Sequence, residues 1–185
     1  GLDCRYAIAK LGMGEYVASL TTVNTPHKGC VYVDYLFGRT SQKFQEAVAK
    51  RYNRAYRILG DHDPDFLAAV RDLSASACDN FNREITYVPD GIFCQSVGSV
   101  IHRFWAAKFP IFLVYPWARK YDGLGDGLVG AESFPWGERY TLLTPRGHKS
   151  ISHCDMTDLF RKNQRHFDVR EFYVQLVNEL KERGL

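Results

Sequence analysis

Short apolar segments alternate with amphipathic helical segments along this chain, and this alternation constrains its fold more than any other feature. Residues 17–24 are apolar and β-branched, and residues 110–115 and 140–143 form further apolar runs. Such runs are typical of strands that are buried on both faces of a parallel sheet. Because helical segments separate these strands, the pattern predicts an α/β fold whose mainly parallel sheet is flanked by helices.

The number of predicted strands is small for such a sheet. Three segments are expected to be strands, and residues 92–95 are a short fourth candidate. Sheets have about five to six strands on average. We therefore expect residues 1–185 to form a single but incomplete α/β domain.

Helices are expected at both ends of the chain and in a long middle segment. Residues 2–11 are predicted to form a short helix, and apolar residues recur at helical spacing through residues 169–180. The same spacing runs through residues 41–60, and further helical turns are expected beyond them. Residues 38–82 are thus predicted to be an amphipathic helical insertion between two strands.

Composition places the chain among globular proteins and excludes one class of partner. Hydrophobic residues make up 45% of the chain and charged residues 24%, which is the range of folded domains. A net charge of +3 is too small for the concentrated basic face that tracks phosphates, so nucleic acid is not an expected partner. The 5 cysteines lack CxxC spacing, which favours free thiols and a reducing, cytoplasmic compartment, with secretion as the alternative.

Four short motifs stand out along the chain. They are GLDCRY at residues 1–6, TPHKG at residues 25–29, DGLV with ES and WG at residues 126–137, and SHCDM at residues 152–156. In type and order they resemble the bacterial triacylglycerol lipases of the α/β-hydrolase superfamily, over nearly the whole chain. The resemblance implies the C-terminal portion of an α/β-hydrolase fold, with residues 38–82 as a lid-like insertion.

The resemblance also implies that Asp126 and His153 are two members of a catalytic triad. Asp126 lies in a glycine-rich loop and His153 lies in a later loop, in the chain order that α/β-hydrolases use for acid and base. In such a triad the acid orients the imidazole, and the imidazole takes the proton of a nucleophilic serine. Asp122 and His148 are the nearby alternatives for the two roles.

The nucleophile of the triad is not expected within this chain. No G-x-S-x-G motif occurs, and the nearest imitation, CQSVG at residues 94–98, lacks the first glycine, so Ser96 is a weak candidate. In the resembled family the serine lies just before a GGLD stretch, and Gly1 is then expected to be the last glycine of the elbow. The serine would belong to a missing N-terminal segment of the same protein, and the isolated chain is expected to be inactive.

Asp155 is the candidate metal ligand. Some lipases of the superfamily hold a structural calcium ion with an aspartate two residues after the histidine, and Asp155 occupies that position. The alternative is that Asp155 or Asp158 caps a helix that begins near Met156. No cofactor is expected to be required. A zinc site is a further alternative, although its four residues fit no standard spacing: His148, His153, Cys154 and Asp155.

The predicted function is hydrolysis of carboxylic esters, with triacylglycerols or similar lipid esters as substrates. Basic residues beside the apolar stripe of the lid-like insertion predict transient contact with a lipid interface. An ordinary helix pair packed over the sheet is the alternative. Two other functions stay open: another α/β-hydrolase activity, such as that of a thioesterase or acyltransferase, and a non-catalytic hydrolase-like binding protein.

Overall fold

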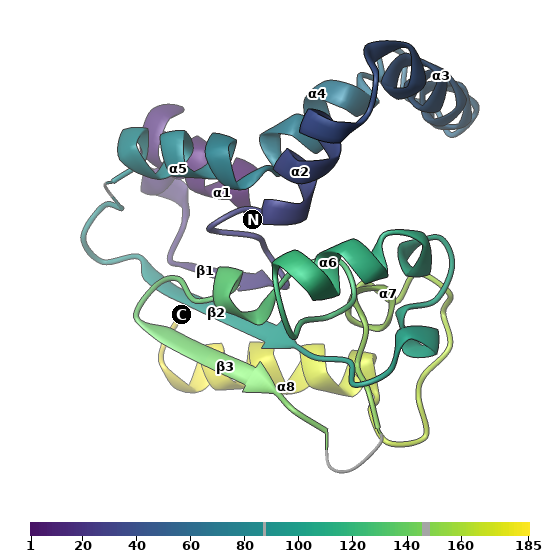
Figure 1. Cartoon of the computed structure of the whole chain (residues 1–185). Coiled ribbons are helices and arrows are strands. Elements are labelled where there is room, and N and C mark those ends of the chain that lie inside the picture. Colours follow the sequence, from purple (N-terminus) through teal and green to yellow (C-terminus); the bar gives the residue numbers. More distant parts are fainter. Residues whose placement is uncertain (87, 146–148) are drawn as a thin grey trace.

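A parallel sheet with helices on both of its faces organises the chain, as the alternating pattern predicts. The structure is a computed structural model that describes residues 1–86, 88–145 and 149–185. Figure 1 shows one long helix beneath the sheet and several shorter helices above it. This layering is the α/β architecture expected from the sequence.

Three strands form the sheet of the described residues, in the order β1-β2-β3: β1 (Ser19–Val23), β2 (Phe93–Ser99) and β3 (Arg139–Leu143). Both pairs of neighbours are parallel, with Thr22 opposite Ser96 and Ser96 opposite Tyr140. β1 and β3 coincide with two of the segments predicted as strands. The short candidate at residues 92–95 is the beginning of the central strand, which is buried over nearly its whole length.

One predicted strand is wrong. Residues 110–115 include a 3₁₀ turn, η3 (Ile111–Leu113), and the start of helix α6 (Tyr115–Tyr121). A proline lies in the first turn of α6, where its fixed φ favours a helix start. Phe112 and Leu113 are 41% and 50% exposed, so this apolar run does not have the two buried faces of an inner strand.

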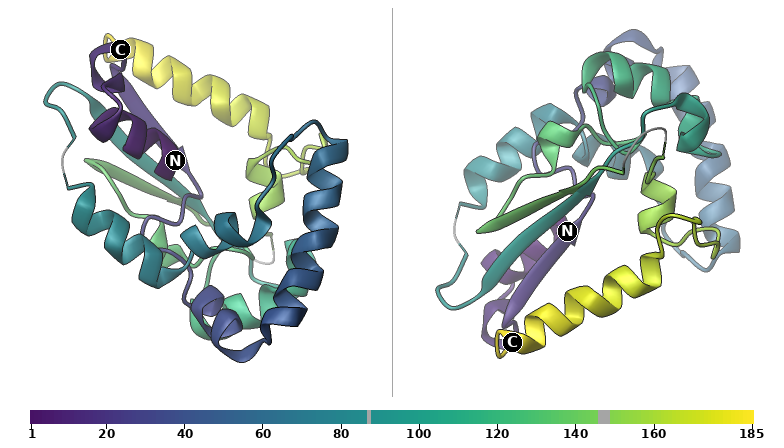
Figure 2. Two further views of the ribbon diagram at one scale, coloured as in Figure 1. Left: turned by 90° about the horizontal axis from the view of Figure 1, so that it is seen from above. Right: turned by 90° about the horizontal axis from the view of Figure 1, so that it is seen from below.

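Apolar side chains pack against both faces of the sheet. The cluster beneath α1 (Leu2–Lys10) contains Ile8, Ile92 and Cys94. The cluster covered by α8 (Val169–Glu182) contains Val97, Ile151 and Met156. Figure 2 shows α8 crossing one face of the sheet while α1 lies on the opposite face. The two terminal helices predicted from their apolar spacing therefore cover opposite sides of the sheet.

Four helices of the described residues lie between β1 and β2: α2 (Val31–Arg39), α3 (Gln42–Ile58), α4 (Phe66–Asp72) and α5 (Ala75–Glu84). The last three begin at side-chain caps, in which Ser41, Asp65 and Ser74 accept a hydrogen bond from a backbone N–H group. Helix α2 was not predicted from the sequence. Helix α3 packs mainly against α4 and stands apart from the sheet (Figure 1), so it does not contribute to the cover of the sheet.

Short helical elements connect the remaining segments: η1 (Met13–Tyr16), η2 (Phe104–Ala107), η4 (Ala131–Ser133) and α7 (His153–Met156). All five cysteines are free thiols, and four of them are buried. Among the helices of the described ranges, none has the length and apolar character that a membrane span requires.

Candidate catalytic site

Asp126 lies in a tight turn whose backbone leaves no room for side chains at its two ends. Gly125 and Gly130 form an antiparallel bridge across the turn. A Cβ atom on Gly125 would lie 2.0 Å from the Val129 carbonyl oxygen. One on Gly130 would lie 2.4 Å from the carbonyl oxygen of Asp122. Because both contacts are with backbone atoms, the turn requires glycine at both positions, which explains the glycine-rich sequence of the loop.

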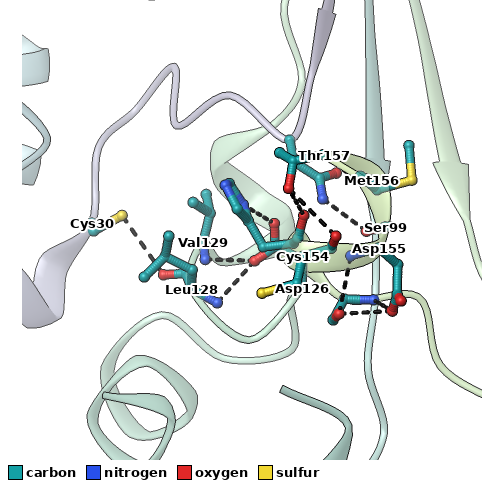
Figure 3. Close-up of polar contacts among 12 residues, drawn as sticks. Cys30, Ser99, Asp126, Leu128, Val129, Cys154, Asp155, Met156 and Thr157 are labelled. Carbon is teal, nitrogen blue, oxygen red and sulfur yellow. Dashed lines mark hydrogen bonds and ion pairs between the residues drawn. The ribbon is translucent and has the colours of Figure 1, made fainter. Parts of the chain in front are cut away.

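The turn fixes the carboxylate of Asp126 through both oxygens. The side chain is fully buried, and Oδ1 accepts hydrogen bonds from the N–H groups of Leu128 at 2.9 Å and Val129 at 2.8 Å (Figure 3). Oδ2 lies 2.7 Å from Nδ1 of His153. The two side chains are therefore hydrogen-bonded, as an acid that orients an imidazole requires, and the catalytic roles of the two residues stay a prediction.

His153 is the first residue of α7 and contacts the acid loop, the turn of residues 125–130 that carries Asp126, in two places. Besides the side-chain contact, its backbone N–H donates to the Asp126 carbonyl oxygen at 3.0 Å. With the carboxylate accepting from Nδ1–H, the neutral ring carries its free lone pair on Nε2. The His153 side chain is 25% exposed, so part of the ring remains accessible to a reacting group.

Burial and the neighbouring acid act on the pKa of His153 in opposite directions. Burial lowers this pKa because it disfavours the charged ring, whereas the hydrogen bond and the charge of Asp126 raise it. The acid outweighs burial, and the pKa of His153 lies above its ordinary value. The pair therefore stabilises an imidazolium, the species that forms when a histidine takes a proton from a nucleophile.

Asp155 lies two residues after His153 and closes a capping box at the start of α7. Its Oδ2 accepts hydrogen bonds from the backbone N–H of Ser152 at 2.8 Å and from the Ser152 hydroxyl at 2.7 Å. The Ser152 hydroxyl in turn accepts from the N–H of Asp155. Asp155 thus takes part in capping a helix, as the alternative proposed, but as the third residue of α7, whose N-cap is Ser152, and not as the cap of a helix that begins near Met156.

The second oxygen of Asp155 is paired with a cation of the chain itself. Oδ1 contacts the Lys108 ammonium and accepts a hydrogen bond from the side-chain amide of Gln164 at 2.9 Å. Burial raises the pKa of Asp155, but hydrogen bonds from Gln164, Lys108 and Ser152 outweigh it, and the pKa lies below its ordinary value.

These surroundings of Asp155 do not fit a calcium ion. Calcium takes about six to eight oxygen ligands, whereas the carboxylate faces an ammonium, an amide N–H and the Ser152 donors. In the described ranges, no group of three or more His, Cys, Asp or Glu side chains is placed to hold a metal ion.

The nearby alternatives weighed from the sequence make structural contacts. Asp122 accepts hydrogen bonds from the N–H groups of Val31 at 2.6 Å and Tyr32 at 3.0 Å, and so caps the beginning of α2. Ser96 is buried in β2 and exchanges hydrogen bonds with the backbone of Trp136. His148, and with it the alternative zinc site, lies outside the described residues.

Two polar residues beside the candidate pair were not found from the sequence. Lys108 contacts Asp155, and the side-chain amide of Asn24 donates to the Ser99 hydroxyl at 2.8 Å, which ties together the ends of β1 and β2. Neither residue belongs to a motif. Lys108 lies between two apolar segments of the sequence, and this position was the only indication that its charge is paired with an anion.

The known proteins that this chain is similar to are named as lipases. No family model matches the chain. The chain aligns over its whole length with triacylglycerol lipase 2 of Saccharomyces cerevisiae, with 25% identity over 207 residues, and the alignment covers 55% of that protein. The mature lipase BlEst2 of Bacillus licheniformis superposes with a TM-score of 0.52 and 19% identity, over 82% of this chain and 56% of that chain.

The chain has the α/β-hydrolase fold of these lipases. The propeptide form of the Bacillus enzyme agrees, with a TM-score of 0.52 and 19% identity over 91% of this chain and 35% of that chain. The α/β-hydrolase fold expected from the four motifs is thereby confirmed. The chain spans about half the length of the curated lipase that it matches.

Proposed function

We propose that the whole protein to which this α/β-hydrolase chain belongs hydrolyses carboxylic esters, with lipid esters such as triacylglycerols as substrates. The observation that carries the proposal is the 2.7 Å contact between His153 Nδ1 and Asp126 Oδ2, beside a partly exposed ring. The yeast and Bacillus relatives, both named as lipases, favour the same substrate class.

In this reaction Asp126 orients the imidazole and His153 moves the proton. Nε2 of the neutral ring takes the proton of a serine hydroxyl as it attacks the ester carbonyl, and the imidazolium gives that proton to the departing alcohol. In the second half, the same nitrogen takes a proton from water as the water oxygen attacks the acyl carbonyl, and returns it to the serine oxygen when the bond to the acyl group breaks and the carboxylic acid leaves. Asp126 stays ionised throughout and stabilises the imidazolium.

We further propose that residues preceding Gly1 supply the serine. Gly1 packs against Thr25, just after β1, because a Cβ atom on Gly1 would lie 2.3 Å from the Thr25 hydroxyl oxygen. On the histidine side, the N–H of Ile151 donates to the carbonyl oxygen of Val100, just after β2, at 3.0 Å. Since parallel strands end at one edge of a sheet, Gly1 and His153 belong to the same edge, which supports a nucleophile from that side.

The insertion at residues 38–82 is proposed to act as a lid at a lipid surface. Helix α3 contacts mainly α4, and apolar side chains at its C-terminal end are exposed, with Ile58 at 79% and Leu59 at 81%. A helix attached to the body through so few elements can change its position at low cost. Exposed apolar residues on such a helix suit a transient contact with lipid.

Ester hydrolysis by the purified whole protein tests this proposal, with His153→Ala compared against His102→Ala. His102 is an exposed histidine near the same edge of the sheet, where its backbone N–H donates to the Ser150 hydroxyl. His153→Ala is expected to lower kcat by about 10³-fold or more, because the base is lost. His102→Ala is expected to keep kcat within about two-fold of the wild type.

A fluorophosphonate probe identifies the nucleophile directly. It is expected to label one serine outside residues 1–185, and the label should be lost in His153→Ala. Labelling of Ser96, or unaltered hydrolysis by His153→Ala, would contradict the proposal. Preference for thioesters or for transfer to an alcohol would indicate a thioesterase or an acyltransferase. A wild-type protein that neither hydrolyses esters nor takes the label would be a binding protein.

A further inference from the structure

Lys108 lies beside both loops of the proposed catalytic pair, the acid loop and the histidine loop at residues 152–156. It directly follows η2, and its neighbour Ala107 is fully buried in a cluster with Cys154 of the histidine loop. Ala107 also touches the acid loop, where a Cβ atom on Gly127 would lie 3.1 Å from the Cβ atom of Ala107. The backbone at Lys108 is therefore anchored to the acid loop and to the histidine loop at once.

The backbone of Lys108 has a conformation that only glycine adopts readily. Its φ is 60° and its ψ is 160°. A side chain makes this region costly, so a residue other than glycine stays there only where its surroundings determine the conformation. From this position the Lys108 ammonium reaches Oδ1 of Asp155 and lies 5.6 Å from the centre of the Phe160 ring.

The ion pair completes a series of contacts that fixes the first turn of α7. The Asp155 side chain is only 5% exposed and that of Lys108 is 26% exposed, so the two charges meet largely away from water. The other oxygen of Asp155 holds the N–H and the hydroxyl of Ser152. Ser152 directly precedes His153, which begins the helix. A shift of Asp155 would therefore move the backbone that carries the imidazole.

The cavity beside this ion pair has the wrong charge for a metal ion. Its volume is about 540 Å³, and it is lined by two lysines, one histidine and one carboxylate: Lys108, Lys149, His166 and Asp155. Two ammonium groups around a single carboxylate oppose the approach of a divalent cation, because each repels it at short range. The nearest cation to Asp155 is thus the one that the chain itself provides.

We infer that Lys108 is a positioning residue for the catalytic histidine, and that its ammonium holds the histidine loop through Asp155 in place of a calcium ion. Lipases of the resembled type that use calcium steady the same loop with a bound metal. In this chain the lysine is part of the polypeptide itself, in the segment that precedes the acid loop, so the cation is present without uptake from solution. This inference rests on the proposed function, since it assigns His153 as the base.

The test compares Lys108→Gln with Lys149→Gln in the whole protein, because each change removes one ammonium from the same cavity. Lys108→Gln is expected to lower kcat for ester hydrolysis about ten- to a hundred-fold with KM little changed, since a displaced imidazole slows proton transfer without touching the substrate. Lys108→Arg, which keeps the charge, is expected to recover most of kcat. Equal kcat values for the two glutamine variants would overturn the inference.

Thermal unfolding provides a readout that does not depend on catalysis. The unfolding midpoint of the wild type is expected to be the same in EGTA and in millimolar calcium chloride. A midpoint that falls in EGTA and returns with calcium would overturn the inference, and this result decides the matter if Lys108→Gln does not fold. Absence of ester hydrolysis by the wild type would refute the proposed function but not this inference. The unfolding data would still show whether the lysine or a bound metal ion holds the histidine loop.

A double variant tests whether the two side chains act as one pair. Lys108→Gln combined with Asp155→Asn is expected to unfold at the midpoint of the less stable single variant, because the second change removes a contact that is already lost. Losses that add in full would overturn the pairing.

Discussion

Replacing Asp126 with asparagine should remove the base at His153 while it keeps the shape of the acid loop. Oδ1 of Asp126 faces two donors, the N–H groups of Leu128 and Val129. The carbonyl oxygen of the asparagine must take this position, because an NH₂ group there would face donors and leave them unpaired. The NH₂ group then faces Nδ1 of His153, which must become the acceptor, and the ring proton moves to Nε2.

The expected loss follows from the state of Nε2. A neutral ring protonated at Nε2 cannot take a proton from the nucleophile, and the imidazolium loses the carboxylate that lies 2.7 Å from Nδ1. In serine hydrolases a change of this kind lowers kcat by about 10³- to 10⁴-fold. That factor corresponds to about 4 to 5.5 kcal/mol of lost transition-state stabilisation. Folding should change little, because both backbone hydrogen bonds to the side-chain oxygen are kept.

Steady-state hydrolysis of a soluble p-nitrophenyl ester and thermal unfolding, measured on the same preparations of the whole protein, check this expectation. Asp122→Asn is the matched control, since it makes the same change in a carboxylate that caps α2. It should lower the unfolding midpoint and retain kcat, with KM near the wild-type value in both variants. An Asp126→Asn protein that is folded and keeps kcat within about ten-fold of the wild type would refute the reasoning about the tautomer.

Three further predictions concern pH and the acid loop. Burial lowers the pKa of His27 to about 3, so the unfolded chain takes up this proton first. The free energy of unfolding should therefore fall as pH drops from about 6.5 towards 3, by up to about 1.4 kcal/mol per pH unit from this group, and denaturant titrations of the wild type and His27→Gln should differ in this slope. Asp126 raises the pKa of His153 above its ordinary value of about 6.5, against the effect of burial. The ring therefore becomes protonated, and kcat/KM falls, at a pH above about 6.5. A pH profile of kcat/KM that reaches half of its maximum at or below about 6.5 would contradict the shift. Gly125→Ala should lower activity and the unfolding midpoint together, because its Cβ atom would lie 2.0 Å from the Val129 carbonyl oxygen; wild-type values for both would show that the turn relaxes freely.

The parts of the fold that could be predicted are those where burial leaves a repeating pattern. The apolar run at residues 17–24 predicts β1 because a strand covered on both faces needs apolar residues at successive positions. Residues 110–115 have the same composition and form a turn and a helix start instead. In this run Ile111 is buried in a loop cluster whereas Phe112 and Leu113 are exposed, and composition does not separate such an arrangement from an inner strand.

Helix α2 was missed for a different reason. Its beginning is capped by Asp122, a residue about ninety positions away in the chain, through N–H groups of Val31 and Tyr32. Caps within a few residues, such as Ser41 for α3, are visible in the sequence. A cap that a distant residue supplies through a tertiary contact is not visible in the sequence, because no residue near position 31 indicates where the helix begins.

The candidate site likewise contains residues that the sequence predicts and residues that only tertiary contacts reveal. Asp126 and His153 could be predicted from motif order, and the structure adds the hydrogen bond between them. Lys108 could not be predicted, because its contact with Asp155 joins residues that are 47 positions apart. For Asp155 the resemblance implied a possible metal ligand and the sequence left helix capping as the alternative; the capping box and the contact with Lys108 oppose the metal.

The order of the strands has a practical consequence for protein engineering. In the described residues β1 pairs only with β2, so the N–H and C=O groups along its other side have no neighbouring strand. Such an edge accepts any strand that fits, including that of a second copy, and residues 1–185 expressed alone should therefore tend to self-associate. The same edge is a natural seam at which the proposed esterase activity could be tested with two separately expressed fragments that fused partners bring together.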